Sequence, residues 1–190
     1  MLAALLPSRL STPVDDQSEH KRRALFQPLI AVLRQLEDLL DHLNDAQYRQ
    51  KPVGIVNSSI GGHVRHCLDH VEALLRAIDT GELNYDHRER DTVVETSSRA
   101  AREVIHRLER QLLALWPDVL EHPLRMRTLL SPSLAPLDVA TSVGREVAFV
   151  LSHTVHHNAV IDVMARTLGV PVPEKFGYAP STLAHLEKTA

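Results

Sequence analysis

Four long stretches of this chain repeat apolar residues every three to four positions, which is the spacing of one buried face of an α-helix. They cover residues 28–44, 60–81, 91–116 and 143–169. Pro28 is acceptable in a first turn, and Gly81 and Gly169 are typical helix stops. Because few other segments read as strands, the pattern predicts an all-α protein, a four-helix bundle.

The connection before the last helical stretch is long and rich in proline. Between residues 120 and 141 the chain carries Pro123, Pro132 and Pro136, with a short extended run over 124–130. This predicts a long crossover connection with room for a small hairpin. For domain organisation we expect a flexible N-terminal arm over residues 1–23 and a single bundle domain over residues 24–190.

Charge and cysteine content exclude several classes of protein. The formal net charge is −3 and the basic residues alternate with acidic ones, so no patch for nucleic acid is expected. No apolar run reaches the length of a membrane span, and the N-terminus does not resemble a signal peptide, so we expect a cytoplasmic protein without a membrane partner. The single cysteine, Cys67, excludes thiolate-rich zinc sites and is expected to be a buried, inert thiol.

Half of the twelve histidines fall in two short clusters, one in the second helical stretch and one in the fourth. The first cluster is His63, His66 and His70, and the second is His153, His156 and His157. Residues four apart lie on one face of a helix, so the imidazoles of such a pair can converge on one ion. Random placement would put about one histidine in these two windows. The clusters therefore predict the two halves of a metal site, against the alternative of surface or core histidines.

The two histidine segments carry a family resemblance. The segment SIGGHVRHCLDH at residues 59–70, together with SHTVHHNAV at residues 152–160, resembles the DinB-like superfamily of metalloenzymes. The resemblance covers residues 28–169. It implies a four-helix bundle with a long crossover, often a homodimer, in which one histidine of the second helix joins a pair on the fourth.

The resemblance also implies the ligand set. His66 aligns with the family's second-helix ligand, with His63 as its rival, and His153 and His157 match the paired ligands. Three neutral imidazoles leave coordination positions open, which is typical of a catalytic ion. This donor set suits Zn or Ni first, and Fe or Co as alternatives.

Other polar residues are candidates for supporting roles. Glu146 lies seven residues before His153 on the same helical face, where it is a candidate base or a support for a ligand, against the alternative of a buried or rim carboxylate with neither role. Thr154 occupies the place of the glutamate in H-E-x-x-H proteases, which disfavours peptidase chemistry. His63, His70 and His156 are candidates for the shell around the ligands, and a plain structural role is the favoured alternative for His70 and His156. Tyr85 and Arg88 are candidate pocket residues for an anion, or else part of a solvated loop.

Members of this superfamily with assigned activities include metal-dependent thiol transferases and thiol-dependent isomerases. By resemblance, we expect a divalent-metal-dependent S-transferase that joins a low-molecular-weight thiol to a small electrophilic substrate. The alternatives are a metal-dependent hydrolase of small molecules and a metal-binding or stress-response module without turnover. The sequence does not distinguish these three.

Overall fold

The computed structural model describes residues 16–86 and 92–189. Within these ranges the helices are α1 (Asp16–Leu40), α2 (Asp45–Arg49), α3 (Ile60–Thr80), α4 (Val93–Thr96), α5 (Ser98–Leu113), α6 (Val143–Thr167) and α7 (Pro180–Thr189). A 3-10 helix spans Pro117–Glu121, and the strands are β1 (Glu82–Leu83), β2 (Pro123–Thr128) and β3 (Leu137–Ser142). The fold is mostly helical, as predicted.

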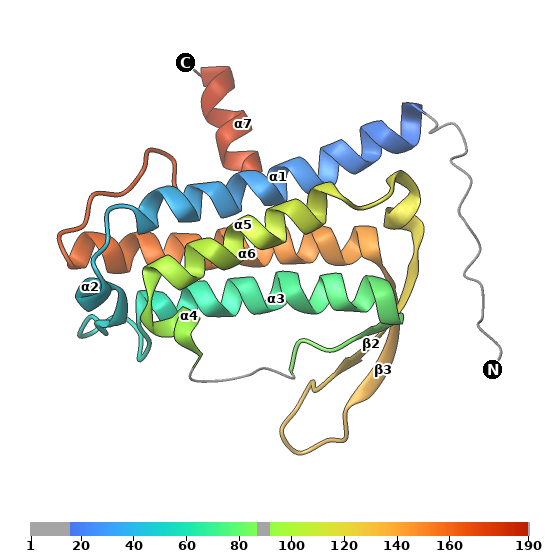
Figure 1. Cartoon of the computed structure of the whole chain (residues 1–190), viewed down its shortest axis with the longest axis horizontal. Helices are drawn as coiled ribbons and strands as arrows, with labels where there is room; N and C mark the ends of the chain where they lie inside the picture. The colour runs from blue at the N-terminus through green and yellow to red at the C-terminus, as the bar shows by residue number, and fades with distance from the viewer. Residues whose placement is uncertain (1–15, 87–91, 190) are drawn as a thin grey trace, which may run out of the picture.

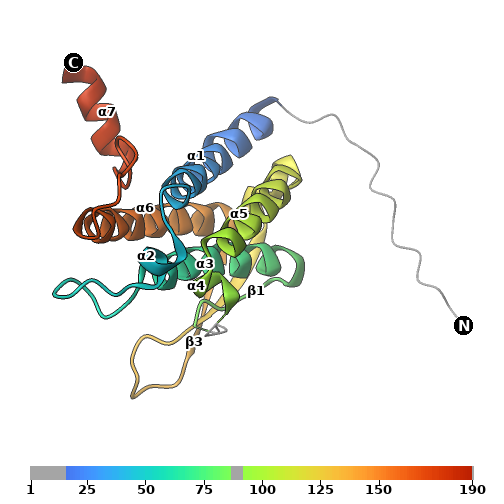
Figure 2. The ribbon, with the colours of Figure 1, turned by 60° about the vertical axis from the view of Figure 1, so that its left-hand side comes forward.

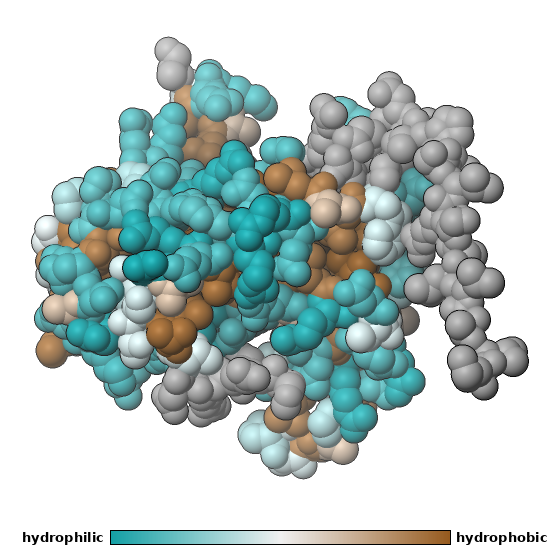
Figure 3. Space-filling view, viewed as in Figure 1, coloured by the Kyte–Doolittle hydropathy of each residue, from teal (hydrophilic) through white to brown (hydrophobic). Residues whose placement is uncertain are grey.

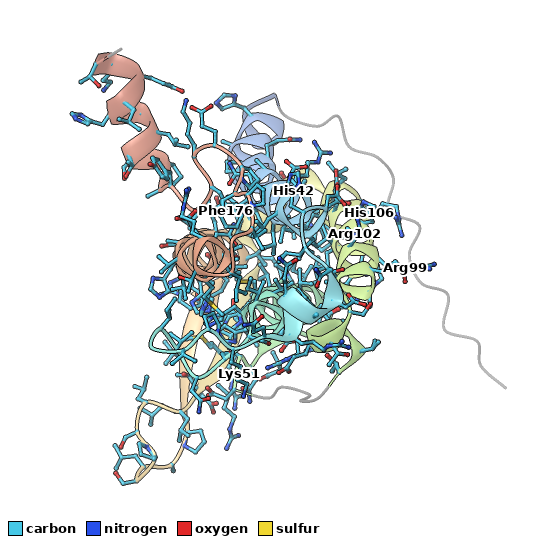
Figure 4. All side chains as sticks on the ribbon, turned by 90° about the vertical axis from the view of Figure 1, so that its left-hand side faces the viewer. His42, Lys51, Arg99, Arg102, His106 and Phe176 are labelled. Carbon is cyan, nitrogen blue, oxygen red and sulfur yellow. The ribbon has the colours of Figure 1, made fainter. Side chains whose placement is uncertain are left out.

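Helices α1, α3, α5 and α6 lie side by side and form the bundle (Figures 1 and 2). The core runs along their shared axis, where Leu29, Leu33, Leu36 and Leu40 of α1 are fully buried at the helical spacing. On the outer side, polar side chains of α5 also contact acidic side chains of α1 and of the residue that follows it. Looking along the helices in Figure 4, Arg102 and His106 extend from α5 beside α1, where they pair with Asp41 and Glu37.

The prediction of an all-α chain is wrong in one respect, because the described residues also form a three-stranded sheet in the order β1-β2-β3. Strands β2 and β3 lie in the crossover, where a small hairpin was expected, and β1 follows α3. Strand β1 pairs with β2 in parallel, and β2 pairs with β3 as an antiparallel hairpin. The expected extended run over 124–130 overlaps β2. Strand β3 lacks a clear sequence signal because Leu137 through Ala140 are all exposed, so no buried face imposes alternation.

Two helix boundaries differ from the expected ones. Helix α1 begins at Asp16 and contains Pro28 in its interior, so the end of the expected arm over residues 1–23 is helical. Residues 1–15 lie outside the described ranges. The expected third helix is divided at Ser97, whose side chain accepts a hydrogen bond from the backbone N–H of Ala100 and so begins α5.

Helices α3 and α6 run antiparallel, and each begins with a serine cap. The Ser59 side chain accepts from the N–H of Gly62, and the Ser142 side chain accepts from the N–H of Arg145. Helix α3 ends at Gly81, which has a left-handed φ of 77°. These caps fix where each histidine cluster starts along its helix.

The hairpin and the C-terminal helix extend away from the bundle. Figure 3 shows apolar surface at the hairpin tip, where Leu129, Leu130 and Leu134 are exposed. Before α7, the tail packs on α6 through the buried Phe176, and α7 itself points outward (Figures 2 and 4). Within the described ranges, no helix combines the length and apolar character that crossing a membrane requires.

Candidate metal centre

The facing surfaces of α3 and α6 bring the two histidine clusters together. His66 Nε2 lies 2.9 Å from His153 Nε2, and His63 Nδ1 lies 2.9 Å from His157 Nδ1. Because the helices are antiparallel, these two pairs follow one another along the interface at about one turn of helix. Both clusters predicted from the sequence therefore belong to one site.

Three of the imidazoles converge on a common point. His66, His70 and His153 each offer a ring nitrogen, and these atoms all lie within 4.8 Å of one another. His70 Nδ1 lies 2.8 Å from the backbone carbonyl oxygen of His66. A carbonyl oxygen only accepts, so His70 Nδ1 carries the proton and the lone pair is on Nε2. This is the usual second hydrogen bond of a metal-binding histidine.

His157 lies beside this group. Its ring centroid is 4.6 Å from that of His66 and 4.6 Å from that of His153. Burial, with the neighbouring histidines, lowers the pKa of His157 to about 3, and burial together with His156 lowers the pKa of His63. Both imidazoles are therefore neutral near pH 7, which is the form that binds a cation.

These residues fit a divalent cation. Two ligand nitrogens about 2.1 Å from one ion and at right angles to each other are about 3.0 Å apart, close to the 2.9 Å between His66 Nε2 and His153 Nε2. The expected ligands His66 and His153 thus meet, with His157 adjacent. His70, expected only as a supporting residue, also offers a ring nitrogen within 4.8 Å of those of His66 and His153. His156 is exposed, with its ring 5.3 Å from that of His157.

Glu146 is fully buried and accepts three hydrogen bonds. The donors are the Tyr85 hydroxyl at 3.0 Å, the Thr141 hydroxyl at 2.6 Å and the Arg145 guanidinium at 2.8 Å. Both carboxylate oxygens of Glu146 therefore already accept hydrogen bonds from neighbouring side chains. Glu146 thus contacts Tyr85, whose ring stacks on His70, and its expected role as a base or as a support for a ligand stays a prediction.

Tyr85 connects Glu146 to the histidines. Its ring stacks on that of His70, with centroids 4.8 Å apart and an interplanar angle of 14°. Burial, followed by the charge of Glu146, raises the pKa of the Tyr85 hydroxyl far above its usual range. The second pocket candidate, Arg88, lies outside the described residues.

Phe149 was missed by the sequence reasoning. Its ring stacks on that of His153 at 5.5 Å and lies 5.4 Å from that of Tyr85. The available signal was its position four residues before His153, on the same face of α6. The rings of Tyr85 and Phe149 thus cover one end of the histidine cluster. They restrict the rotation of the imidazoles that they contact, His70 and His153.

Comparisons with known proteins identify the family of the chain and a similar fold. The family model of the DinB superfamily matches residues 29–161. The crystal structure of the DinB-like protein YjoA from Bacillus subtilis superposes with a TM-score of 0.57 at 16% identity, over 79% of this chain and 96% of that chain. At that identity, the likeness concerns the fold alone.

A curated relative also matches. FK506-binding protein 5 of Rhizopus delemar is 35% identical over 107 residues, which are 56% of this chain and 28% of that protein. The chain thus spans less than a third of that relative's length.

Proposed function

Because the chain belongs to the DinB superfamily, we propose that it is a divalent-metal-dependent enzyme that joins a low-molecular-weight thiol to a small electrophilic substrate. The observation that carries this proposal is the pair of imidazoles contributed by facing helices, His66 and His153, with further imidazoles beside them. Sites built in this way are typical of helical bundles.

We propose His66, His153 and His157 as the ligands, with His70 as the additional candidate. An all-imidazole donor set suits Zn or Ni, and also Fe or Co. When bound, the ion would act as a Lewis acid and lower the pKa of a coordinated thiol or water. Burial lowers the pKa of His157 and so keeps its imidazole neutral, and the His66 carbonyl oxygen accepts a hydrogen bond that orients His70.

The surroundings of the site favour a thiol as nucleophile. Thr154 stands where a protease would carry its glutamate, and it is buried with its hydroxyl donating to the carbonyl oxygen of Val150. Glu146 is already bonded to three donors. Neither residue serves readily as a general base. A thiol needs a strong base less than water does, because its own pKa is far lower.

Metal content tests the first part of the proposal. Protein purified without a histidine tag should contain about one divalent ion per chain by elemental analysis. Single replacements of His66, His153 and His157 by Ala should each weaken binding strongly, whereas the same change at the exposed His42 should not. A variant in which His66, His153 and His157 are all replaced by Ala should bind no metal. Undiminished metal content in that variant would overturn the ligand assignment.

Turnover tests the second part. A panel of electrophiles should be consumed only when both metal and a thiol such as glutathione, bacillithiol or mycothiol are present. Metal-dependent turnover that ignores the thiol would instead identify a hydrolase. Metal binding without turnover in any combination would identify a non-catalytic module.

We also propose that the protein is a homodimer. Family resemblance motivates this, and the exposed apolar side chains of the hairpin, including Leu130, Leu134 and Leu137, support it. Strand β3 is the edge strand of the sheet as described, so its outer backbone groups are available to a second copy.

A further inference from the structure

His63 is one turn before His66 on α3, and its ring is tilted by 41° against that of His157, with the centroids 5.1 Å apart. Its Nδ1 contacts the Nδ1 of His157, whereas the His66 pair joins two Nε2 atoms. The two cross-helix pairs therefore use different ring nitrogens. Two ring nitrogens that lie 2.9 Å apart and share no ion form a hydrogen bond, in which one atom carries the proton and the other the lone pair.

The ligand role of His157 decides which atom carries that proton. If Nε2 of His157 faces the ion, its lone pair is on Nε2 and its proton is on Nδ1. His157 Nδ1–H then donates to His63 Nδ1, and His63 carries its own proton on Nε2. Imidazole ligands commonly donate their second N–H in this way, which fixes the orientation of the ring.

We propose that His63 is a positioning residue that accepts a hydrogen bond from His157 Nδ1 and thereby orients His157 Nε2 toward the metal. This proposal rests on the proposed function, because it takes His157 as a ligand. It assigns His63 a role outside the coordination sphere and leaves His66 as the ligand from that part of α3.

The environment of the second ring nitrogen, His63 Nε2, indicates that His63 contributes to function rather than to stability. His63 Nε2 is buried and has no hydrogen-bond partner among the described residues. A buried polar group without a partner lowers stability, so an imidazole here is costly to the fold. A leucine would avoid that cost. The contact with His157 accounts for an imidazole at this position.

Three variants separate the roles of the two nitrogens. In His63→Asn, the amide oxygen can occupy the place of Nδ1 and accept from His157. In His63→Gln, the amide lies nearer the place of Nε2, and in His63→Leu both polar atoms are lost. The same three substitutions at the exposed His42 serve as matched controls, and His66→Asn is the reference for loss of a ligand.

We expect His63→Leu and His63→Gln to weaken zinc binding about 10- to 100-fold, whereas His63→Asn restores most of the affinity. The thermal midpoint of metal-free His63→Leu should not fall below that of the wild type. A structural role would give the opposite result, with a lower midpoint and unchanged zinc affinity, and would overturn the proposal. So would a loss in His63→Asn as large as in His66→Asn, because His63 would then be a ligand.

Proton positions give an independent measurement. Nitrogen-15 spectra of the metal-free protein should show the proton of His63 on Nε2 and that of His157 on Nδ1. The reverse assignment would overturn this proposal and leave the metal site intact. Wild-type protein that binds no divalent ion would overturn the proposed function itself.

Discussion

The Tyr85 hydroxyl is one of three donors to a carboxylate that is fully buried, so its removal has a defined cost. Tyr85→Phe keeps the ring that stacks on His70 and removes only the hydrogen bond to Glu146. We expect the free energy of unfolding to fall by about 1.5–3 kcal/mol, the usual contribution of a hydrogen bond to a charged group, with little change in metal affinity. Urea unfolding and zinc titration measure the two quantities.

Tyr178 supplies the control for that substitution. Its side chain is 47% exposed, so Tyr178→Phe should leave the unfolding free energy nearly unchanged. Equal stability of Tyr85→Phe and Tyr178→Phe would show that the contact between Tyr85 and Glu146 contributes nothing.

Tyr48 predicts how stability depends on alkaline pH. It is buried, its hydroxyl donates to the carbonyl oxygen of Val94, and burial followed by Glu95 and Asp45 raises its pKa far above 10. Above about pH 10 the unfolded chain loses this proton and the folded chain keeps it, so stability is full below pH 10 and falls as the pH rises further. Urea unfolding between about pH 9 and 11 should show this decline.

The comparison for this pH dependence is Tyr48→Phe, which has no hydroxyl to ionise. Its unfolding free energy should fall less steeply over the same pH range than that of the wild type. Identical slopes for the two proteins would refute the contribution of Tyr48.

At the scale of elements, the start of α3 approaches α4 closely at Gly61, because glycine has no side chain. A Cβ on Gly61 would lie 2.1 Å from the carbonyl oxygen of Glu95 and 2.8 Å from the Tyr48 ring. Gly61→Ala should therefore displace one of these elements and destabilise the protein by about 1–3 kcal/mol, despite the better helix propensity of alanine. Thermal unfolding measures the effect.

Gly62 is the matched comparison one residue later. A Cβ there would meet the Ser58 hydroxyl at 2.5 Å, and that side chain can rotate away. Gly62→Ala should be tolerated far better than Gly61→Ala. Equal midpoints for the two variants would contradict the close packing of α3 on α4.

The helices were predictable from the sequence because each buries one stripe at a regular period, as Leu29, Leu33 and Leu36 do in α1. The small hairpin expected in the crossover is present as β2 and β3, but the third strand, β1, was not predicted, because it has only two residues and pairs with a strand distant in the sequence. The clustering of the histidines predicted which helix faces meet. It could not predict that His63 faces His157 while His66 faces His153, because that pairing depends on the axial offset between α3 and α6.

Cys67 shows what sequence reasoning can resolve at a single position. It was expected to be an inert buried thiol, and the structure places it fully buried on α3, where burial and Asp69 raise its pKa to about 12. The expected role of Arg88, which lies outside the described residues, stays a prediction.

For the molecule as a whole, the exposed hairpin tip predicts self-association. Light scattering across micromolar concentrations should give the mass of two chains. Replacing Leu130 and Leu134 by Ser should shift the protein toward a monomer, because it removes exposed apolar area that contact would bury. A wild-type monomer throughout that range would refute the dimer, and an unchanged dimer in the variant would place the interface elsewhere.

The small sheet has a consequence for the distance between the histidines. Strand β1 begins directly after the cap of α3 at Gly81, and β3 ends at Ser142, the cap of α6. Both strands pair with β2, so β2 sets how far α6 is advanced along α3. One residue inserted after Ser142 would turn α6 by about 100° and carry His153 out of line with His66. Residues added at the hairpin tip would leave the register of α6 on α3 unchanged, so the length of the hairpin affects the histidine site only through its base.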